Sequence, residues 1–204
     1  MHGLIRTLAH LIQTDKDLNK ERPMNDLPDR FPRGWFVLGH QRDFPIGETN
    51  TIYGFDRKIQ VQRLEDGSIK IDLGNTDEWP ILEINQMVMV WHDAEKKEPD
   101  FLPKKIEECY SDEWSDYGMA SFLVKNNCRE LIDNMADKGH FGPVHQAPFE
   151  GFWNEAKDHT YTQEMTADSP ILGRDLFSQA TYEGPAYMTT YMSAIHDGNK
   201  VESR

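Results

Sequence analysis

The segment from residue 127 to 145 constrains the fold and the chemistry of this chain more than any other. Asn127 and Glu130 are three residues apart, which is the spacing of a helix capping box. The helix that this box would begin has one apolar face, made by Leu131, Ile132 and Met135. Gly139 then permits the helix to end. The sequence therefore predicts a short helix over residues 127–139, followed directly by a polar turn.

Four polar residues of this segment are candidates for a metal site: Asn134, Asp137, His140 and His145. The first three follow one another at intervals of three, so they would lie along one stripe of a helix. Pro143 interrupts a regular helix, and a turn there would bring His145 back beside His140. Two imidazoles and a nearby carboxylate are the donor set of the non-haem Fe(II) facial triad. The spacing alone also allows two solvated histidines that are hydrogen-bonded to the backbone and bind no metal.

The string Asn-x-x-Asp-x-x-His-x-x-x-x-His resembles the mononuclear-iron motif of Rieske-type non-haem iron oxygenases. Further stretches, in the family's order from about residue 31 to 192, resemble the oxygenase component of 3-ketosteroid 9α-hydroxylase. They are Phe31–Gly39, Thr76–Trp79, Val90–Asp93, Asp112–Asp116, Cys128–Glu130 and Ala180–Met188. The resemblance implies an α+β fold: the remnant of a small antiparallel β Rieske-like domain, followed by a partial catalytic domain with a helix over an antiparallel sheet (a helix-grip fold).

The resemblance also implies an activity and a role for each candidate residue. His140 and His145 would be ligands of a mononuclear Fe(II) that hydroxylates an apolar substrate, such as a steroid, with O₂. Asp137 would act through hydrogen bonds, since its counterpart in the family bridges towards a cluster histidine of the neighbouring subunit, and Asn134 would line the site. Family members take electrons from a ferredoxin reductase through a Rieske [2Fe–2S] cluster, and they assemble as trimers.

The chain departs from the family at the cluster. The family holds its cluster on a Cys-x-His pair and a Cys-x-x-His pair, whereas neither Cys109 nor Cys128 is followed by histidine at those spacings. Ser68–Leu73 resembles the strand before the first pair, and Trp79–Ile84 resembles the strand after the second. The cluster-binding hairpins are therefore missing as one block, and we expect that this chain cannot ligate a [2Fe–2S] cluster.

A second departure concerns the third iron ligand. The resemblance places that carboxylate on a late helix beyond the matched region, and this sequence stops at Arg204. With two histidines as its protein ligands the site would bind Fe(II) weakly. We therefore expect that this chain is impaired or inactive as an oxygenase when it acts alone.

Composition limits the classes of partner. The 204 residues carry a net charge of −13, which disfavours nucleic acids and anionic membrane surfaces. The mean hydropathy is −0.71, and no apolar stretch approaches the 18 residues of a membrane span. With two cysteines and a start unlike a signal peptide, the sequence predicts a soluble, cytoplasmic protein. The resemblance adds a homo-oligomer to this expectation.

The chain divides into three predicted parts. Residues 1–30 form an amphipathic helix, for packing or oligomer contact, and an extended connection. Residues 31–100 form the Rieske-like β domain without its cluster hairpins, and residues 101–204 the partial mononuclear-iron domain. The segments predicted as strands are Trp35–Leu38, Thr51–Phe55, Lys58–Arg63, Ser68–Leu73, Ile81–Ile84, Met87–Trp91, Met119–Val124, Thr160–Thr166, Leu176–Glu183 and Tyr187–Ala194. We expect the second sheet to end in an unpaired edge strand.

Some interpretations stay open at the level of sequence. The aromatic residues after the histidines, among them Phe141, Phe149, Phe152 and Trp153, suit either the wall of an apolar pocket or an ordinary core. The acidic cluster of Asp112, Glu113 and Asp116 is typical of a solvated surface. Two other functions fit the sequence: a non-catalytic protein that binds an apolar small molecule, and an incomplete gene product that folds poorly.

Overall fold

The computed structural model describes residues 31–126 and 128–204, which form two compact units, and the chain passes from the first unit to the second between Val124 and Lys125. The predicted N-terminal helix, the whole predicted segment 1–30 and the first residue of the capping box, Asn127, lie outside the described residues. Within the described ranges, no helix is long and apolar enough to span a membrane.

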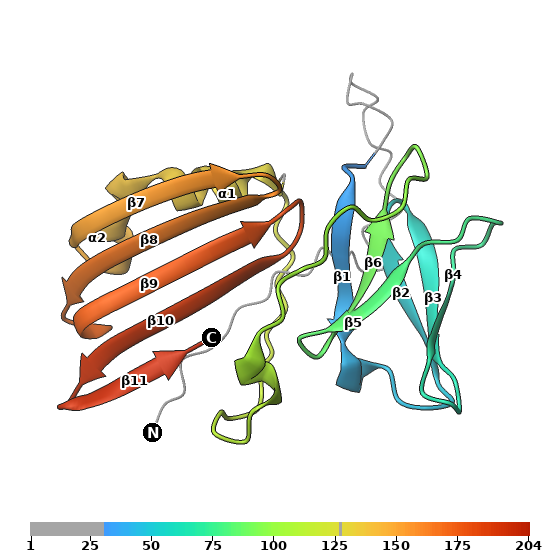
Figure 1. The fold of residues 1–204 in the computed structure, drawn as a ribbon, viewed down its shortest axis with the longest axis horizontal. Helices are drawn as coiled ribbons and strands as arrows, with labels where there is room; N and C mark the ends of the chain where they lie inside the picture. Colours follow the sequence, from blue (N-terminus) through green and yellow to red (C-terminus); the bar gives the residue numbers. More distant parts are fainter. Residues whose placement is uncertain (1–30, 127) are drawn as a thin grey trace. The chain divides into compact units, whose positions relative to one another are not determined.

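The first unit is made of two three-stranded antiparallel sheets, with strand orders β1-β6-β5 and β2-β3-β4 (Figure 1). The strands are β1 Gly34–His40, β2 Thr49–Gly54, β3 Arg57–Arg63, β4 Ile69–Asp72, β5 Ile81–Ile84 and β6 Met87–His92. Two 3-10 turns, η1 Gln41–Asp43 and η2 Glu107–Tyr110, complete the unit. All six strands were predicted from alternation and turn residues.

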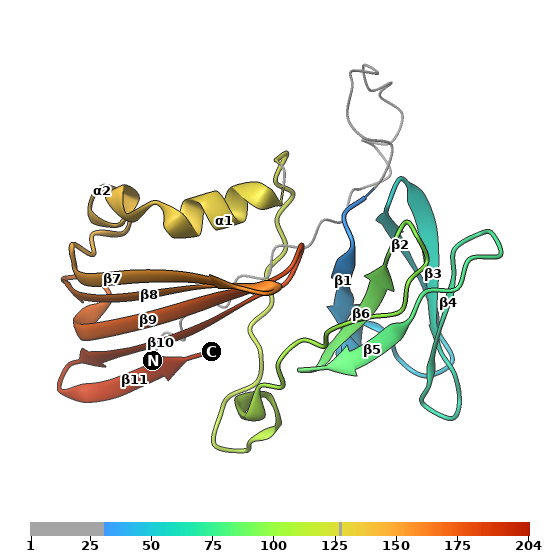
Figure 2. The ribbon, with the colours of Figure 1, turned by 45° about the horizontal axis from the view of Figure 1, so that its top comes forward.

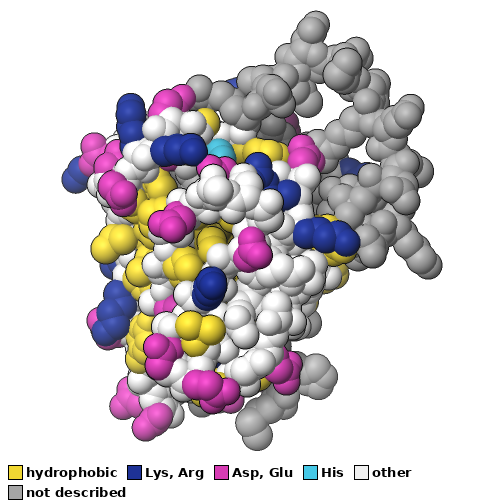
Figure 3. Space-filling model, turned by 90° about the vertical axis from the view of Figure 1, so that its right-hand side faces the viewer, with side chains coloured by type: hydrophobic (Ala, Val, Ile, Leu, Met, Phe, Trp, Pro, Cys, Tyr) yellow, Lys and Arg dark blue, Asp and Glu magenta, His cyan; other side chains and the backbone are white. Residues whose placement is uncertain are grey.

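The core of this unit lies between the two sheets. Ile59 and Val61 of β3 and Val88 and Val90 of β6 are fully buried and belong to one hydrophobic cluster. Burial of one such side chain stabilises a fold by about 1.5–3 kcal/mol. Figure 3 views the side of this unit that carries β4, where hydrophobic side chains form a band between acidic and basic ones.

The β5–β6 turn anchors the segment that follows the sheets. Asn85 and Gln86 have φ of 53° and 61°, the left-handed conformation that a tight hairpin turn requires. Asn85 is fully buried, and its amide bonds the backbone of Lys104 and Ile106, each at 2.8 Å. These bonds attach residues from 101 onward to the first unit, although the sequence predicts that they begin the second domain. The domain boundary at residue 100 stays a prediction.

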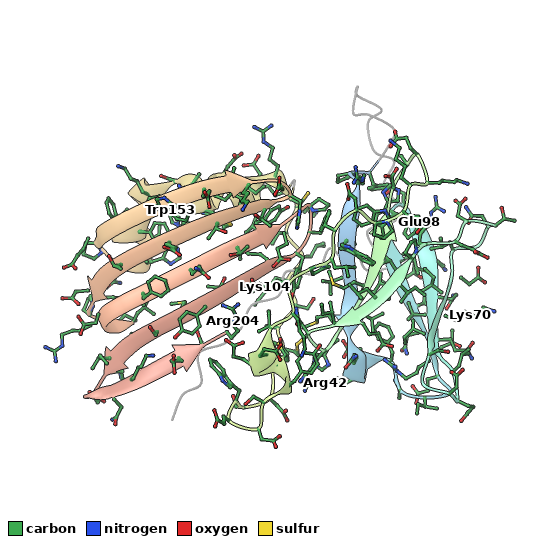
Figure 4. The ribbon with its side chains drawn as sticks, viewed as in Figure 1. Arg42, Lys70, Glu98, Lys104, Trp153 and Arg204 are labelled. Atoms are coloured by element: carbon green, nitrogen blue, oxygen red, sulfur yellow. The ribbon has the colours of Figure 1, made fainter. Side chains whose placement is uncertain are left out.

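The second unit is a five-stranded antiparallel sheet in sequential order, with two helices over one face (Figure 2). The strands are β7 Phe149–Lys157, β8 Thr160–Ser169, β9 Gly173–Glu183, β10 Met188–His196 and β11 Asn199–Ser203. The helices are α1 Arg129–Ala136 and α2 Phe141–His145, joined by the 3-10 turn η3 Lys138–His140. Figure 4 shows Trp153 on β7 and Arg204 beyond β11, at opposite edges of the sheet.

The α+β class, with antiparallel sheets and a helical layer over the second sheet, is confirmed. Two local predictions were wrong, and two strands were not predicted. Met119–Val124 forms no strand, because it has no hydrogen-bonded ladder with any described strand, and the side chains of Phe122, Leu123 and Val124 are exposed. β7 was not predicted, and the residues after Gly198 form β11, which pairs with β10 in full register. The helix ends at Ala136 and not at Gly139.

Candidate metal centre

Helix α1 is held on the sheet by the apolar face that the sequence predicts. Met135 is buried and packs with Ala180 and Tyr182, while Leu131 and Ile132 pack against the same cluster. Burial, and then the neighbouring Cys128, raises the pKa of the Tyr182 hydroxyl, which donates to the carbonyl oxygen of Pro185. The phenol is therefore neutral, and it fixes this end of β9 beneath the helix.

Asp137 ends the helix and starts the turn that carries His140. Its backbone is extended, with φ −79° and ψ 92°, so the predicted stripe from Asn134 through Asp137 to His140 is not one continuous helix. The carboxylate of Asp137 accepts a hydrogen bond of 2.9 Å from the backbone N–H of Gly139. Since this bond caps η3, the first role of the Asp137 carboxylate is to hold the turn.

His140 is oriented by the backbone of Asp137. Its Nδ1 lies 2.5 Å from the carbonyl oxygen of Asp137, which can only accept, so Nδ1 carries the proton. That tautomer leaves Nε2 with its lone pair available to a metal ion. The Asp137 carboxylate lies further away, at 3.7 Å from the same Nδ1, and the side chain of His140 is 13% exposed.

His145 lies beside His140 as predicted, but a short helix brings it there and not an irregular turn. Residues Phe141–His145 form α2, and Pro143 is tolerated there because the N–H groups of a first helical turn have no partner inside the helix. Gln146, at φ 51° and ψ 35°, ends α2 in the left-handed conformation. The two imidazole rings lie 5.1 Å apart between centroids, inclined by 70°. This spacing allows one metal ion to be bound by both rings.

The aromatic residues around the pair separate into core and surface. Phe141 lies 4.4 Å from the ring of His140 and 5.7 Å from that of Phe152, and both phenylalanines pack on the buried cluster under α2. Phe149 is partly exposed beside Phe152. Trp153 directly follows Phe152 in β7, and successive side chains of a strand point to opposite faces. Trp153 therefore lies on the face of the sheet away from the histidines.

The remaining candidate, Asn134, lies on the last turn of α1 with an exposed side chain. Its carbonyl oxygen accepts from the N–H of Asp137 at 3.3 Å. The hydrogen bonds and ring contacts of the described residues include none between Asn134 and either imidazole. Its role as a residue that lines the site stays a prediction.

The donor set fits a divalent metal ion in part. Two neutral imidazoles suit Fe(II), Co(II) or Zn(II). Across residues 31–126 and 128–204, no group of three histidine, cysteine or carboxylate side chains converges on one point. His140 and His145 would supply two ligands, and water or further groups would have to complete the coordination.

The sequence did not single out Asn154 and Gln163, which lie under the helices. They are direct neighbours across β7 and β8, on the same face of the sheet as the buried Met165. Gln163 is 3% exposed, and its Nε2 has no hydrogen-bond partner among the described residues; the same is true of Asn154 Oδ1. Alternation along β8 could have identified Gln163, because it stands between Tyr161 and Met165 at a core-facing position. A buried amide without partners is rare in native folds.

Known proteins share both the sequence and the fold. The family of the 3-ketosteroid 9α-hydroxylase C-terminal domain matches residues 90–204. A 3-ketosteroid-9-alpha-monooxygenase oxygenase component from Rhodococcus rhodochrous is 28% identical, over 86% of this chain and 60% of the relative. The counterpart from Mycolicibacterium smegmatis is 27% identical, over 87% and 62%. The chain thus spans about 60% of the length of the curated relatives it matches.

Solved structures agree with the fold. Dicamba monooxygenase superposes with a TM-score of 0.60 at 13% identity, over 83% of this chain and 71% of the other. A quaternary ammonium Rieske monooxygenase superposes with a TM-score of 0.56, also at 13% identity, over 83% and 67%. At this identity the likeness concerns the fold alone. Since the family match covers more than half of its residues, this chain belongs to the family of the 3-ketosteroid 9α-hydroxylase C-terminal domain.

Proposed function

We propose that this chain is an oxygenase-related protein that binds mononuclear Fe(II) through His140 and His145, like the terminal oxygenase of a steroid hydroxylase. The observation that carries the proposal is the pairing of the two rings at 5.1 Å, with His140 held in the tautomer that presents Nε2. The sequence relatives support the same type of chemistry, since their names describe 3-ketosteroid monooxygenases.

Fe(II), when bound, supplies the activation of O₂ for hydroxylation of an unactivated carbon. The protein's part is to hold the ligands. The Asp137 carbonyl fixes the ring of His140, and the Asp137 carboxylate caps the turn that carries it. Phe141 lies beside both imidazoles, with its ring centroid 4.4 Å from that of His140 and 5.7 Å from that of His145. Such support normally tunes metal affinity by about ten- to a hundredfold.

The proposed substrate is apolar and would bind on the helix-facing side of the second sheet. The helix-facing side of the sheet is built mainly from hydrophobic residues, and the Asn154–Gln163 pair interrupts it with one free donor and one free acceptor. A mostly apolar site with a few placed polar groups is typical of small-molecule binding. We therefore propose a substrate of the steroid type, whose polar group meets Gln163.

The proposal extends to partners and to activity. By analogy with the family, the chain would act in the cytoplasm as a homo-oligomer, a trimer in the family, and receive electrons through a reductase. Because its described residues provide two iron ligands, we expect weak Fe(II) binding and impaired turnover when this chain acts alone.

A titration with Co(II), whose visible absorption reports coordination, tests the proposal. We expect binding by the intact chain and its loss in both His140→Ala and His145→Ala. His159→Ala is the matched control, because His159 is an exposed histidine in the turn between β7 and β8, outside the paired site. Equal metal content in all of these proteins would show that His140 and His145 are not the ligands.

A second candidate function is the binding of an apolar small molecule without catalysis. Asn154 Oδ1 and Gln163 Nε2 favour it, since these buried atoms have no hydrogen-bond partner among the described residues and could bond a ligand without a metal. Titration with a fluorescent sterol in the presence and absence of a chelator separates the two functions. Binding that Gln163→Met weakens and chelation leaves unchanged, together with no Co(II) binding, would support this candidate instead.

A further inference from the structure

The family resemblance implies an iron–sulphur cluster, and the side chains of the first unit do not fit one. A [2Fe–2S] cluster needs four cysteine or histidine ligands at one place. The chain has two cysteines, and Cys128 belongs to the second unit. Cys109, the cysteine of the first unit, is buried with its Sγ 2.6 Å from the hydroxyl of Tyr117. It is therefore fixed beside the β5–β6 turn.

The two described histidines of the first unit, His40 and His92, lie at opposite ends of the sheet. His40 is bonded to Gln86 in the β5–β6 turn, at the end that also holds Cys109. β6 is six residues long and begins at that turn, and His92 is its last residue. At about 3.3 Å per residue, the strand separates the two ends by roughly 16 Å. No shared cluster can bridge that distance.

At the end of the first unit where β4 and β5 are joined, several aromatic side chains lie in contact. Trp79 lies on the short connection between these strands and meets Phe55 at 4.7 Å and His92 at 5.1 Å, both edge to face. Phe55, in the β2–β3 turn, stacks on His92 at 5.0 Å. Phe36 and Phe31 approach Phe55 at 4.7 and 5.1 Å. The rings therefore join both sheets and the connection in one contact network.

Polar bonds fix the connection over these rings. Asp77 accepts from Lys96 Nζ and from Asn75 Nδ2, each at 2.8 Å. These bonds, with Lys96 first, lower the pKa of Asp77, so the ion pair is kept at neutral pH. Arg57 lies over the ring of Trp79 at 5.9 Å. His92 Nδ1 donates to the carbonyl oxygen of Pro32 at 3.1 Å, which orients its ring within the network.

The comparison with relatives agrees with a loss inside the chain. The match to the Rhodococcus relative extends over 236 positions, more than the 204 residues of this chain. The relative therefore has residues within the matched region that have no counterpart here. The resemblance of Ser68–Leu73 and Trp79–Ile84 to the strands that flank the cluster pairs places this loss at the connection that carries Trp79.

We propose that an aromatic plug stabilises this end of the first unit in place of an iron–sulphur cluster and keeps the unit folded without iron. The plug consists of Phe31, Phe36, Phe55, Trp79 and His92. The first unit is then a scaffold and not an electron carrier, and any electrons for the histidine site come from outside this chain.

Growth of the producing cells with and without added iron provides the first test on the full chain. We expect acid-labile sulphide far below the two per chain of a [2Fe–2S] cluster, and the same thermal midpoint of the first unit from both cultures. Sulphide near two per chain, or a midpoint of the first unit that falls when iron is withheld, overturns the proposal. This readout is independent of the Co(II) titration, so failure of the iron site and failure of the plug are distinguishable.

Substitution of Trp79 provides the second test. We expect Trp79→Ala to lower the thermal midpoint of the first unit by roughly 5–10 °C, since it removes the ring that joins the connection to both sheets. Trp79→Phe should recover most of that loss. Phe122→Ala is the control in the same unit, because the side chain of Phe122 is 56% exposed. Equal midpoints for Trp79→Ala and Phe122→Ala overturn the proposal.

Discussion

Asp137 contributes to the candidate metal centre through two separate groups. Its carbonyl oxygen orients His140, and its carboxylate caps the following turn. From the sequence this residue has two possible roles, a substitute third ligand or a hydrogen-bonding support. The geometry favours support, since the carboxylate is already bonded to the N–H of Gly139.

Substitution at Asp137 separates these roles. We expect Asp137→Asn to lower Co(II) affinity by no more than about tenfold, because Asn retains the carbonyl of the backbone and a capping oxygen. Asp137→Ala should lose more, since it removes the cap. Complete loss of Co(II) binding in Asp137→Asn, with an unchanged circular dichroism spectrum, would instead make Asp137 a ligand.

His40 shows how one buried side chain links two elements. Its Nδ1 accepts from the backbone N–H of Arg42 at 3.1 Å, and its Nε2 donates to Gln86 Oε1 at 3.1 Å. Burial, and then the charge of Arg42, lowers the pKa of His40, while the amide of Gln86 and the carboxylates of Asp43 and Asp116 oppose that shift. The folded protein therefore holds a neutral imidazole between η1 and the β5–β6 turn.

The stability of the first unit should depend on pH through His40. Because the pKa is lower in the folded state, the unfolded chain takes up the proton first as the pH falls below about 6.5. The stabilisation is complete above that pH and is lost as the pH falls towards the folded pKa. Urea unfolding between pH 7.5 and 5 should show this loss, and His40→Gln should flatten it. The exposed His196→Gln should leave the slope unchanged; if both variants keep the same slope, His40 is not the cause.

At the scale of elements, alternation and turn residues predicted most of the strands. The exceptions depend on whether a segment has a neighbouring strand to pair with. The turn at Asp66–Gly67 and strand β6 could be predicted, because the turn has an Asp-Gly pair and the strand is a continuous apolar run. Met119–Val124 has the composition of a strand without a neighbour to bond. β11 has little apolar character and forms because the Asp197–Gly198 turn brings it back beside β10. Whether a segment with the composition of a strand finds such a partner is not specified by its own residues.

The candidate site was predictable to a similar degree. The order of Asp137, His140 and His145 indicated their proximity, because few residues separate them. The break of the helix at Ala136 was not predictable from apolar spacing, since the capping bond from Gly139 to Asp137 competes with helical continuation. The Asn154–Gln163 pair depends on the register of β7 and β8, which no local pattern specifies.

Gly173 begins the strand that pairs with both β8 and β10 in the second sheet. It lies at the start of β9 with φ 108°, next to irregularities in the pairing with β8 and β10. A Cβ at this position would lie 2.7 Å from the carbonyl oxygen of Ile195. We expect Gly173→Ala to destabilise the protein by roughly 2–4 kcal/mol, through strain and this collision.

Gly198 offers the matched control for that substitution. It also has a positive φ, 78°, but a Cβ there would meet no atom within 4 Å. Gly198→Ala should therefore cost only about 1 kcal/mol, the price of the backbone conformation. Thermal unfolding of both variants gives the comparison. Equal losses would mean that the close approach to Ile195 is relieved at little cost.

At the scale of the whole molecule, two electrostatic effects oppose each other when salt is added. Thirty-five acidic and 22 basic residues leave a net charge of −13, whose self-repulsion destabilises the folded state. Ion pairs such as Lys96–Asp77 and Lys200–Glu202 act in the other direction. Exposed pairs contribute only about 0–1 kcal/mol each, and salt screens them as well.

We expect the repulsion to dominate, so that stability rises with ionic strength. Raising KCl from about 20 to 300 mM shortens the screening length from roughly 20 to 6 Å, which weakens the long-range repulsion more than contacts at 2.8 Å. The thermal midpoint should increase by a few degrees. Lys96→Gln removes one pair and adds to the negative charge, so its midpoint should start lower and gain more from salt. A midpoint that falls with KCl in the unmodified chain would show that the ion pairs outweigh the net charge.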